Sequence, residues 1–125
     1  MTAHTDTEWF DRPGALAFLG DEALLKEVLD AFVQSSQEYL PQLHQAIASK
    51  DAASVRRYLH RVTPTLGILA SKALRAQTHE VHALWHEPVE TPARDARSRA
   101  LANDLEALVR QVQAELARLS AAPTV

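Results

Sequence analysis

One histidine of the chain, His60, stands among basic side chains at a spacing that suits nucleophilic chemistry. Arg56, Arg57 and Arg61 lie within about one helical turn of it. A neutral imidazole is a good nucleophile near neutral pH, and guanidinium groups beside it stabilise an anion at the ring. An exposed histidine in an arginine-rich stretch is also common as plain solvated surface. Composition alone does not choose between the two interpretations, whereas the sequence around His60 does.

The segment that carries His60 has the spacing of an amphipathic helix, for which Asp51 is a suitable N-cap. Its apolar residues fall within a sector of roughly 100°, and His60 lies about 150° from the centre of that sector. These apolar residues are Val55, Tyr58, Leu59, Val62, Leu66 and Leu69. The pattern predicts that His60 points to solvent.

The outer face beside His60 carries Thr63, Pro64 and Gly67, which are unusual residues for a helix exterior. A proline inside a helix costs about 3 kcal/mol and a glycine about 1 kcal/mol relative to alanine. Both residues keep the surface beside the imidazole shallow. We therefore expect a face that the backbone of another protein can approach closely.

Three further histidines, His79, His82 and His86, follow one another at i, i+3 and i+7 on the next amphipathic segment, beside Glu80 and Glu87. Imidazoles at this spacing can share a zinc or nickel ion. The chain contains no H-E-x-x-H or E-x-x-H motif, and the stripe borders the apolar face of its own segment. A metal-binding helical module is therefore an alternative, but we expect no metal site and favour histidines that shield a packing seam.

The composition and the residues that start and stop helices predict an all-α fold. The chain has 22 Ala and 17 Leu, which favour helices, and only three Gly. A short apolar segment at residues 8–19 precedes four long amphipathic segments with candidate N-caps at Asp21, Asp51, Ser71 and Thr91. Pro41 interrupts the first long segment, where we expect a kink or local break near residues 38–40. Such segments pack as an antiparallel four-helix bundle, here with a short additional N-terminal helix.

The bundle accounts for one domain, residues 8–120, between tails at residues 1–7 and 121–125 that we expect to be disordered. The last amphipathic segment has an apolar seam of nearly heptad spacing, which either completes the bundle or forms a dimer interface. The seam comprises Leu101, Leu105, Leu108, Val112 and Leu116. We expect a monomer rather than a homodimer.

The overall charge and composition exclude several classes of function. A net charge of −3 disfavours nucleic acids and anionic membranes as partners. The chain has no cysteine and no apolar run long enough to span a bilayer, so we expect a cytoplasmic protein. No G-x-x-x-x-G-K-[ST] loop is present, and we expect no ATP site and no autonomous kinase activity.

The net charge hides a division along the chain. Residues 50–75 carry six Lys or Arg side chains and one Asp, for a local charge of +5, whereas the rest of the chain carries −8. Complementary charge speeds the encounter of two proteins more than it tightens their complex. A basic surface centred on an exposed histidine therefore suits an acidic protein partner.

Two stretches of the chain, FDRPGALAFLGDEALLKEVLDAF and LPQLHQAIASKDAASVRRYLHRVTPTLGILASKAL, resemble in order the histidine-containing phosphotransfer (HPt) domain family. This family comprises the phosphocarriers of multistep phosphorelays. The resemblance covers residues 10 to about 86, and its centre is the run HRVTPTLGILA at residues 60–70.

The resemblance implies a four-helix bundle in which His60 is the phosphoacceptor, using Nε2. It also implies response-regulator receiver domains and a hybrid histidine kinase as partners. The Mg²⁺ ion of the reaction would belong to the receiver domain, and this chain would need no cofactor of its own.

The chain departs from the family pattern at three positions. Members usually carry Lys or Arg three residues after the histidine, where this chain has Thr63, and many carry Gly next, where it has Pro64. In the following helix the family commonly has Glu after an apolar residue, where this chain has His82. Three nearby side chains are available to supply the missing cation: Arg56, Arg57 and Arg61. The main alternative is an HPt-like adaptor without phosphotransfer, against which the retained His60 argues.

Overall fold

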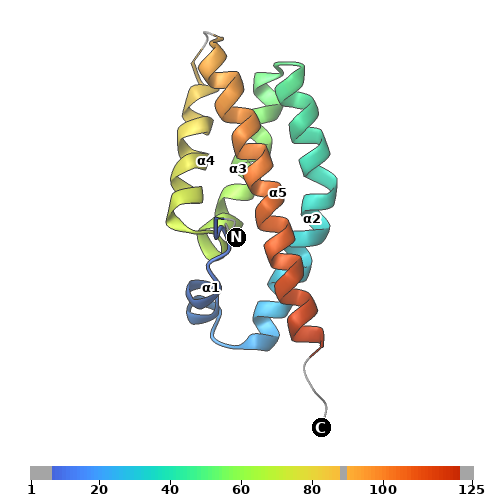
Figure 1. Cartoon of the computed structure of the whole chain (residues 1–125). Coiled ribbons are helices and arrows are strands. Elements are labelled where there is room, and N and C mark those ends of the chain that lie inside the picture. The colour runs from blue at the N-terminus through green and yellow to red at the C-terminus, as the bar shows by residue number, and fades with distance from the viewer. Residues whose placement is uncertain (1–6, 88–89, 122–125) are drawn as a thin grey trace, which may run out of the picture.

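Five helices make up most of the described chain, residues 7–87 and 90–121 of a computed structural model (Figure 1). They are α1 (Arg12–Leu19), α2 (Glu22–Ala48), α3 (Ala52–Leu69), α4 (Lys72–Leu84) and α5 (Pro92–Ser120). The last four alternate in direction and form a closed ring in which α2 packs on α3, α3 on α4, α4 on α5 and α5 on α2. The short α1 packs on α2 and α3. The predicted all-α bundle with an additional N-terminal helix is confirmed.

A short polar side chain caps the start of every helix. The Asp21 carboxylate accepts a hydrogen bond of 2.7 Å from the Leu24 amide, and the Asp51 carboxylate accepts one of 3.2 Å from the Ser54 amide. Side chains of Asp11, Ser71 and Thr91 cap the other three helices. Because each cap satisfies an amide that has no partner within its helix, the starting residue of each helix is fixed.

The second helix continues through Pro41, so of the kink or local break expected near residues 38–40, the local break is wrong. Proline removes the hydrogen bond to the carbonyl four residues earlier, that of Gln37. Both residues lie on the exposed side of α2, where water can satisfy that carbonyl. On the other side Tyr39, Leu40 and Leu43 are buried, and their packing keeps the helix intact.

The apolar seam of α5 is part of the monomer core. The first four residues of the seam, Leu101, Leu105, Leu108 and Val112, are at most 1% exposed, and the fifth, Leu116, is half-buried. They face α2 and α4, the two helices on which α5 packs. The seam therefore completes the bundle and is not available as a dimer interface.

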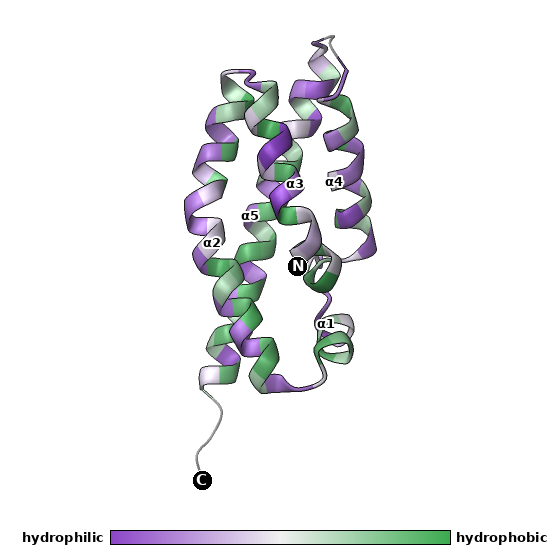
Figure 2. Ribbon diagram, turned by 180° about the vertical axis from the view of Figure 1, so that it is seen from behind, coloured by the Kyte–Doolittle hydropathy of each residue, from purple (hydrophilic) through white to green (hydrophobic). Residues whose placement is uncertain are grey.

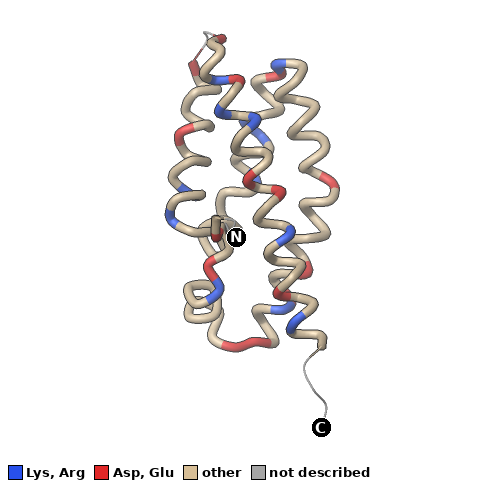
Figure 3. Tube along the Cα trace, in the orientation of Figure 1, with Lys and Arg blue, Asp and Glu red and all other residues tan. Residues whose placement is uncertain are grey.

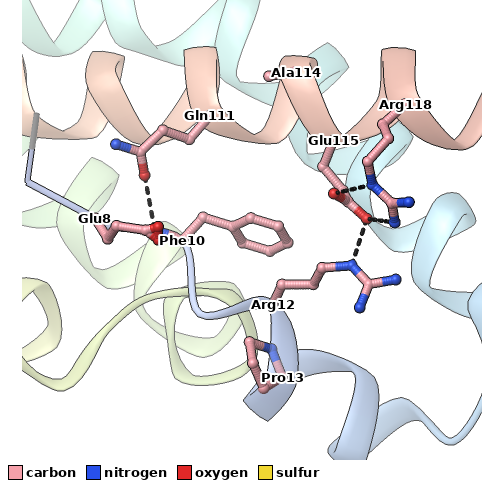
Figure 4. Close-up of a pocket in the computed structure, with 8 residues that line it drawn as sticks. All are labelled: Glu8, Phe10, Arg12, Pro13, Gln111, Ala114, Glu115 and Arg118. Carbon is pink, nitrogen blue, oxygen red and sulfur yellow. Dashed lines mark hydrogen bonds and ion pairs between the residues drawn. The ribbon is translucent and has the colours of Figure 1, made fainter. Parts of the chain in front are cut away.

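Residues 7–11 form an extended strap that lies against α5. The Gln111 side-chain carbonyl accepts hydrogen bonds of 2.8 Å from the Trp9 amide and 3.0 Å from the Phe10 amide, the second of which is drawn in Figure 4. The Gln111 side-chain amide donates one of 2.7 Å to the Thr7 carbonyl. On the other side of the strap, two backbone hydrogen bonds of 2.8 Å join it to the connection between α3 and α4. The strap thus ties α5 to the end of α3.

The tails predicted at residues 1–7 and 121–125 fall mostly outside the described residues, since residues 1–6 and 122–125 are not among them. Thr7 is held by Gln111, and the Ala121 amide donates to the Ala117 carbonyl at 2.9 Å. Within residues 7–87 and 90–121, no helix combines the length and the apolar character needed to cross a membrane.

A buried carboxylate near the strap holds two arginines from opposite ends of the chain. Glu115 of α5 is 9% exposed and lies 2.6 Å from Arg12 Nε and 2.7 Å from Arg118 Nη2 (Figure 4). Hydrogen bonds from Arg118, and next from Arg12, hold the pKa of Glu115 below its usual range. This contact joins the start of α1 to the end of α5.

We expect Glu115→Gln to weaken the acid dependence of stability. A depressed pKa in the folded state means that the carboxylate stabilises the fold above its unfolded-state pKa, and that this stabilisation is lost as pH falls through the folded-state pKa. Urea unfolding as a function of pH measures it, with the exposed Glu27→Gln as control. Parallel pH profiles for the two variants would contradict the assignment.

Leu105→Ala should lower the free energy of unfolding by about 2–5 kcal/mol, because it leaves a cavity at a fully buried position of α5. The matched control is Leu24→Ala in the first turn of α2, where the side chain is 40% exposed. Denaturant unfolding followed by circular dichroism gives both values. Equal losses would show that the α5 seam is not the core of the monomer.

Candidate functional site

His60 lies exposed on the outer face of α3, between the buried residues Leu59 and Val62. The predicted orientation toward solvent is therefore confirmed. Of the six residues predicted to face inward, Tyr58 is only half-buried, and its hydroxyl bonds Gln42 of α2 instead of entering the core. In Figure 2, α3 shows a strongly hydrophilic stretch in its first half.

Arg56, one turn before His60, reaches across to the next helix. It is half-buried, and its Nη1 donates a hydrogen bond of 2.9 Å to the backbone carbonyl of Trp85, the C-cap residue of α4. A cation is favourable at this end of a helix, where carbonyl groups lack partners and the helix dipole is negative. Arg56 therefore links α3, one turn before His60, to the end of α4.

Arg57 and Arg61 are the exposed arginines of the predicted set. The Arg57 guanidinium donates to the Ser54 hydroxyl at 3.3 Å and lies 5.1 Å from the centre of the Tyr58 ring, so it remains along its own helix. Arg61 lines a groove of about 260 Å³ between α2 and α3. Arg61 is thus the cation next to His60 that borders an open surface.

The groove beside Arg61 is mostly apolar, with Val28, Phe32 and Val62 among its lining residues. Tyr39 also lines it and is only 4% exposed. Burial raises the pKa of the Tyr39 hydroxyl to about 12, against smaller opposing effects of Ser36 and Arg61. The phenol therefore stays neutral, and the groove offers an apolar floor with one positive charge at its rim.

The three unusual residues of the outer face have distinct roles. Thr63 is half-buried and its hydroxyl donates to the Leu59 carbonyl at 2.7 Å, so it points back along the helix. Pro64 is exposed and lacks the amide that would bond the His60 carbonyl. A Cβ atom at Gly67 would meet no atom within 4 Å. The surface beside His60 is open, as the sequence predicts.

Lys50 does not belong to the free basic surface, although it contributes to the local charge of +5. Its Nζ lies 2.6 Å from Glu90 Oε2 and 2.9 Å from Asp95 Oδ2, and these hydrogen bonds raise the Lys50 pKa. Both acids lie outside residues 50–75, in the part of the chain that carries the net charge of −8. The exposed basic side chains that remain on α3 and the start of α4 (Figure 3) are Arg57, Arg61, Lys72 and Arg75.

The charge of His60 affects the pKa of a second histidine, His82 of α4. It is half-buried, and its ring centre lies 4.9 Å from that of His86. Burial lowers the pKa of His82, and the charges of His86, His60, His79 and Arg56 lower it further, in that order. Periodicity and spacing do not pair His82 with His60 in the sequence. The available signal is the place of His82 at the position where the family commonly has Glu.

The structure does not support the alternative of a metal site on α4. Among residues 7–87 and 90–121, no three His, Asp or Glu side chains are arranged to hold a metal ion together. The imidazoles of His82 and His86 tilt against each other at 59°.

A family model described as the Hpt domain matches residues 27–122 of the 125-residue chain. The chain belongs to the Hpt domain family. The match extends through α5, a helix that lies beyond the resemblance in the sequence, so this Hpt domain includes all four helices of the bundle. Comparison with curated proteins and comparison with solved structures each gave no match. Family membership supports a general role in phosphorelay histidine phosphotransfer, and Hpt domains typically interact with response-regulator receiver domains and kinases.

Arg56→Gln should destabilise the Hpt domain by about 1 kcal/mol, since it removes a charge-assisted hydrogen bond that is only half-buried. Arg57→Gln is the matched control, because its guanidinium bonds only within α3 among the contacts described. Urea unfolding compares the two variants. A loss at Arg57 as large as that at Arg56 would argue that the link to Trp85 contributes nothing specific.

Proposed function

We propose that this protein is a histidine phosphocarrier that accepts a phosphoryl group on His60 from an aspartate of one receiver domain and donates it to an aspartate of another. The observation that carries the proposal is the exposed His60 on the open basic face of α3 in an Hpt domain. Phosphoryl transfer requires mainly an accessible, positioned nucleophile. His60 meets that requirement without a deep active site.

In the proposed reaction the lone pair of a neutral His60 Nε2 attacks phosphorus in line with the aspartyl oxygen. The N–P bond forms, the P–O bond breaks, and its electron pair leaves with the aspartate carboxylate of the partner. The proton on Nδ1 stays in place during this step. Return transfer to a second receiver reverses the same sequence of bond changes.

The surface around His60 supports a receiver domain as the partner. An acidic pocket that holds Mg²⁺ and the phosphorylated aspartate would belong to the receiver, and the exposed cations Arg57 and Arg61 would face it. The apolar groove between α2 and α3 would give the complex a surface that excludes water. A hybrid histidine kinase is the proposed source of the phosphate, and the cytoplasm is the proposed compartment.

Transfer from a phosphorylated receiver tests the proposal directly. Wild-type protein incubated with phosphorylated receivers of its host should acquire acid-labile, base-stable phosphate, and His60→Gln should reduce it to background. The control is His44→Gln, which removes an imidazole that pairs with Glu106 across α2 and α5 and should leave uptake intact. Circular dichroism establishes that all three proteins are folded.

Two outcomes would reject this function. Uptake that persists in His60→Gln would place the acceptor elsewhere. Stable binding of a receiver by wild-type protein without any uptake of phosphate would identify the adaptor that is the alternative interpretation of the sequence.

A further inference from the structure

A phosphoryl group on His60 would add a charge of about −2 to a site whose nearest expected cation is missing. Thr63 occupies the position of that cation, and its hydroxyl already donates to the Leu59 carbonyl. Arg57 remains along its own helix and Arg61 points to the groove between α2 and α3. A cation for the phosphoryl group can therefore come from the side of His60 toward α4, the helix on which α3 packs.

The packing of α3 on α4 brings two pairs of side chains together. Arg56 and His60 lie one turn apart on α3, and His82 and His86 lie one turn apart on α4. The hydrogen bond of 2.9 Å from Arg56 to the Trp85 carbonyl sets the register of α3 against the antiparallel α4. In this register the turn of α3 that follows Arg56, which carries His60, lies level with the turn of α4 that precedes Trp85, which carries His82. His82 and Arg56 are half-buried, whereas His60 and His86 are exposed, and the His82 imidazole is under the electrostatic influence of both His60 and Arg56.

We propose that His82 takes up a proton when His60 is phosphorylated and, together with Arg56, supplies the positive charge that stabilises the phosphohistidine. This assignment rests on His60 as the phosphoacceptor. It makes His82 a positioning residue for the phosphoryl group and links each phosphorylation event to the binding of one proton from solvent.

The environment of His82 favours such a change. In the unphosphorylated protein, burial and four cationic or potentially cationic neighbours hold its pKa below the usual range: His79 and His86 from α4, and His60 and Arg56 from α3. From α5, Arg94 lies 3.8 Å above the ring of Trp85, the C-cap residue of α4. A phosphoryl group replaces the effect of His60 with that of a strong anion, which favours the charged imidazole. His82 also lies in the last turn of α4, where the helix dipole favours a cation.

The sign of the pH dependence follows from linkage. Phosphorylation raises the His82 pKa, so the added stability of the phosphorylated form is fully present below the His82 pKa of the unphosphorylated protein. It is lost as pH rises through the His82 pKa of the phosphorylated protein. Between the two values, phosphorylation of His60 becomes more favourable by up to about tenfold for each pH unit of acidification.

NMR titration of the histidine ring signals gives the decisive test. Phosphoramidate, a chemical phosphoryl donor, is used to modify His60, and the site of modification is read from the ring nitrogen shifts. The His82 pKa should be higher in the phosphorylated protein than in the unphosphorylated one. The pair His60→Glu and His60→Gln provides the same comparison without chemistry, because Glu places a carboxylate where Gln is neutral. An unchanged His82 pKa in both comparisons would overturn the proposal.

The pH dependence of the transfer equilibrium provides a functional test, because a purely structural role of His82 would not change it. With one phosphorylated receiver, the ratio of phosphorylated wild-type protein to phosphorylated His82→Gln should increase as pH falls between about 8 and 5. The control His44→Gln removes a histidine that pairs with Glu106 across α2 and α5, and its ratio to wild type should stay constant. A pH-independent ratio for His82→Gln would also reject the proposal.

The outcomes separate this inference from the proposed function. Failure of any receiver to label His60 would reject the phosphocarrier role, yet the paired His60 variants would still report whether His82 responds to an anion there. Conversely, efficient transfer with an unresponsive His82 would retain the phosphocarrier and remove only the proton linkage.

Discussion

Burial of one apolar stripe fixes the rotation of α3 about its own axis. Five of its residues, from Val55 to Leu69, are at most 3% exposed. Full burial of one such side chain is worth about 1.5–3 kcal/mol, and a rotation that turned His60 inward would expose several of them. The outward direction of His60 and the direction of Arg56 toward α4 are therefore set by residues that take no part in chemistry. The other helices of the bundle complete the surfaces against which this stripe packs.

The charges around His60 divide into those that hold the fold and those that remain available. Arg56 links α3 to α4, and Lys50 pairs with Glu90 and Asp95, whereas Arg57 and Arg61 stay exposed. The exposure of His60 was predictable because it follows from local periodicity. The division of the cations into structural and available ones was not predictable, because the Arg56 contact joins residues 29 positions apart. The influence of His60 on His82 likewise depends on how two helices pack.

For the fold, local signals were enough to predict the four long helices and their N-caps, since a cap and the amide that it satisfies lie within three residues. Of the kink or local break expected near residues 38–40, the break was wrong because the buried face opposite Pro41 keeps α2 intact. The α5 seam left two possibilities open, since nearly heptad spacing suits a monomer core and a dimer interface equally. Only the position of α2 against α5 decides between them.

The cap at Asp51 limits how the number of residues in the first half of α3 can vary. The cap fixes the first turn of α3, and His60 follows nine residues later. Inserting or deleting one residue between them would rotate everything beyond that point by about 100° relative to the cap. Either the cap would lose its amide or the imidazole would leave the outer face. The first half of α3 can therefore accept many substitutions on its exposed side, but its number of residues is constrained as tightly as the histidine itself.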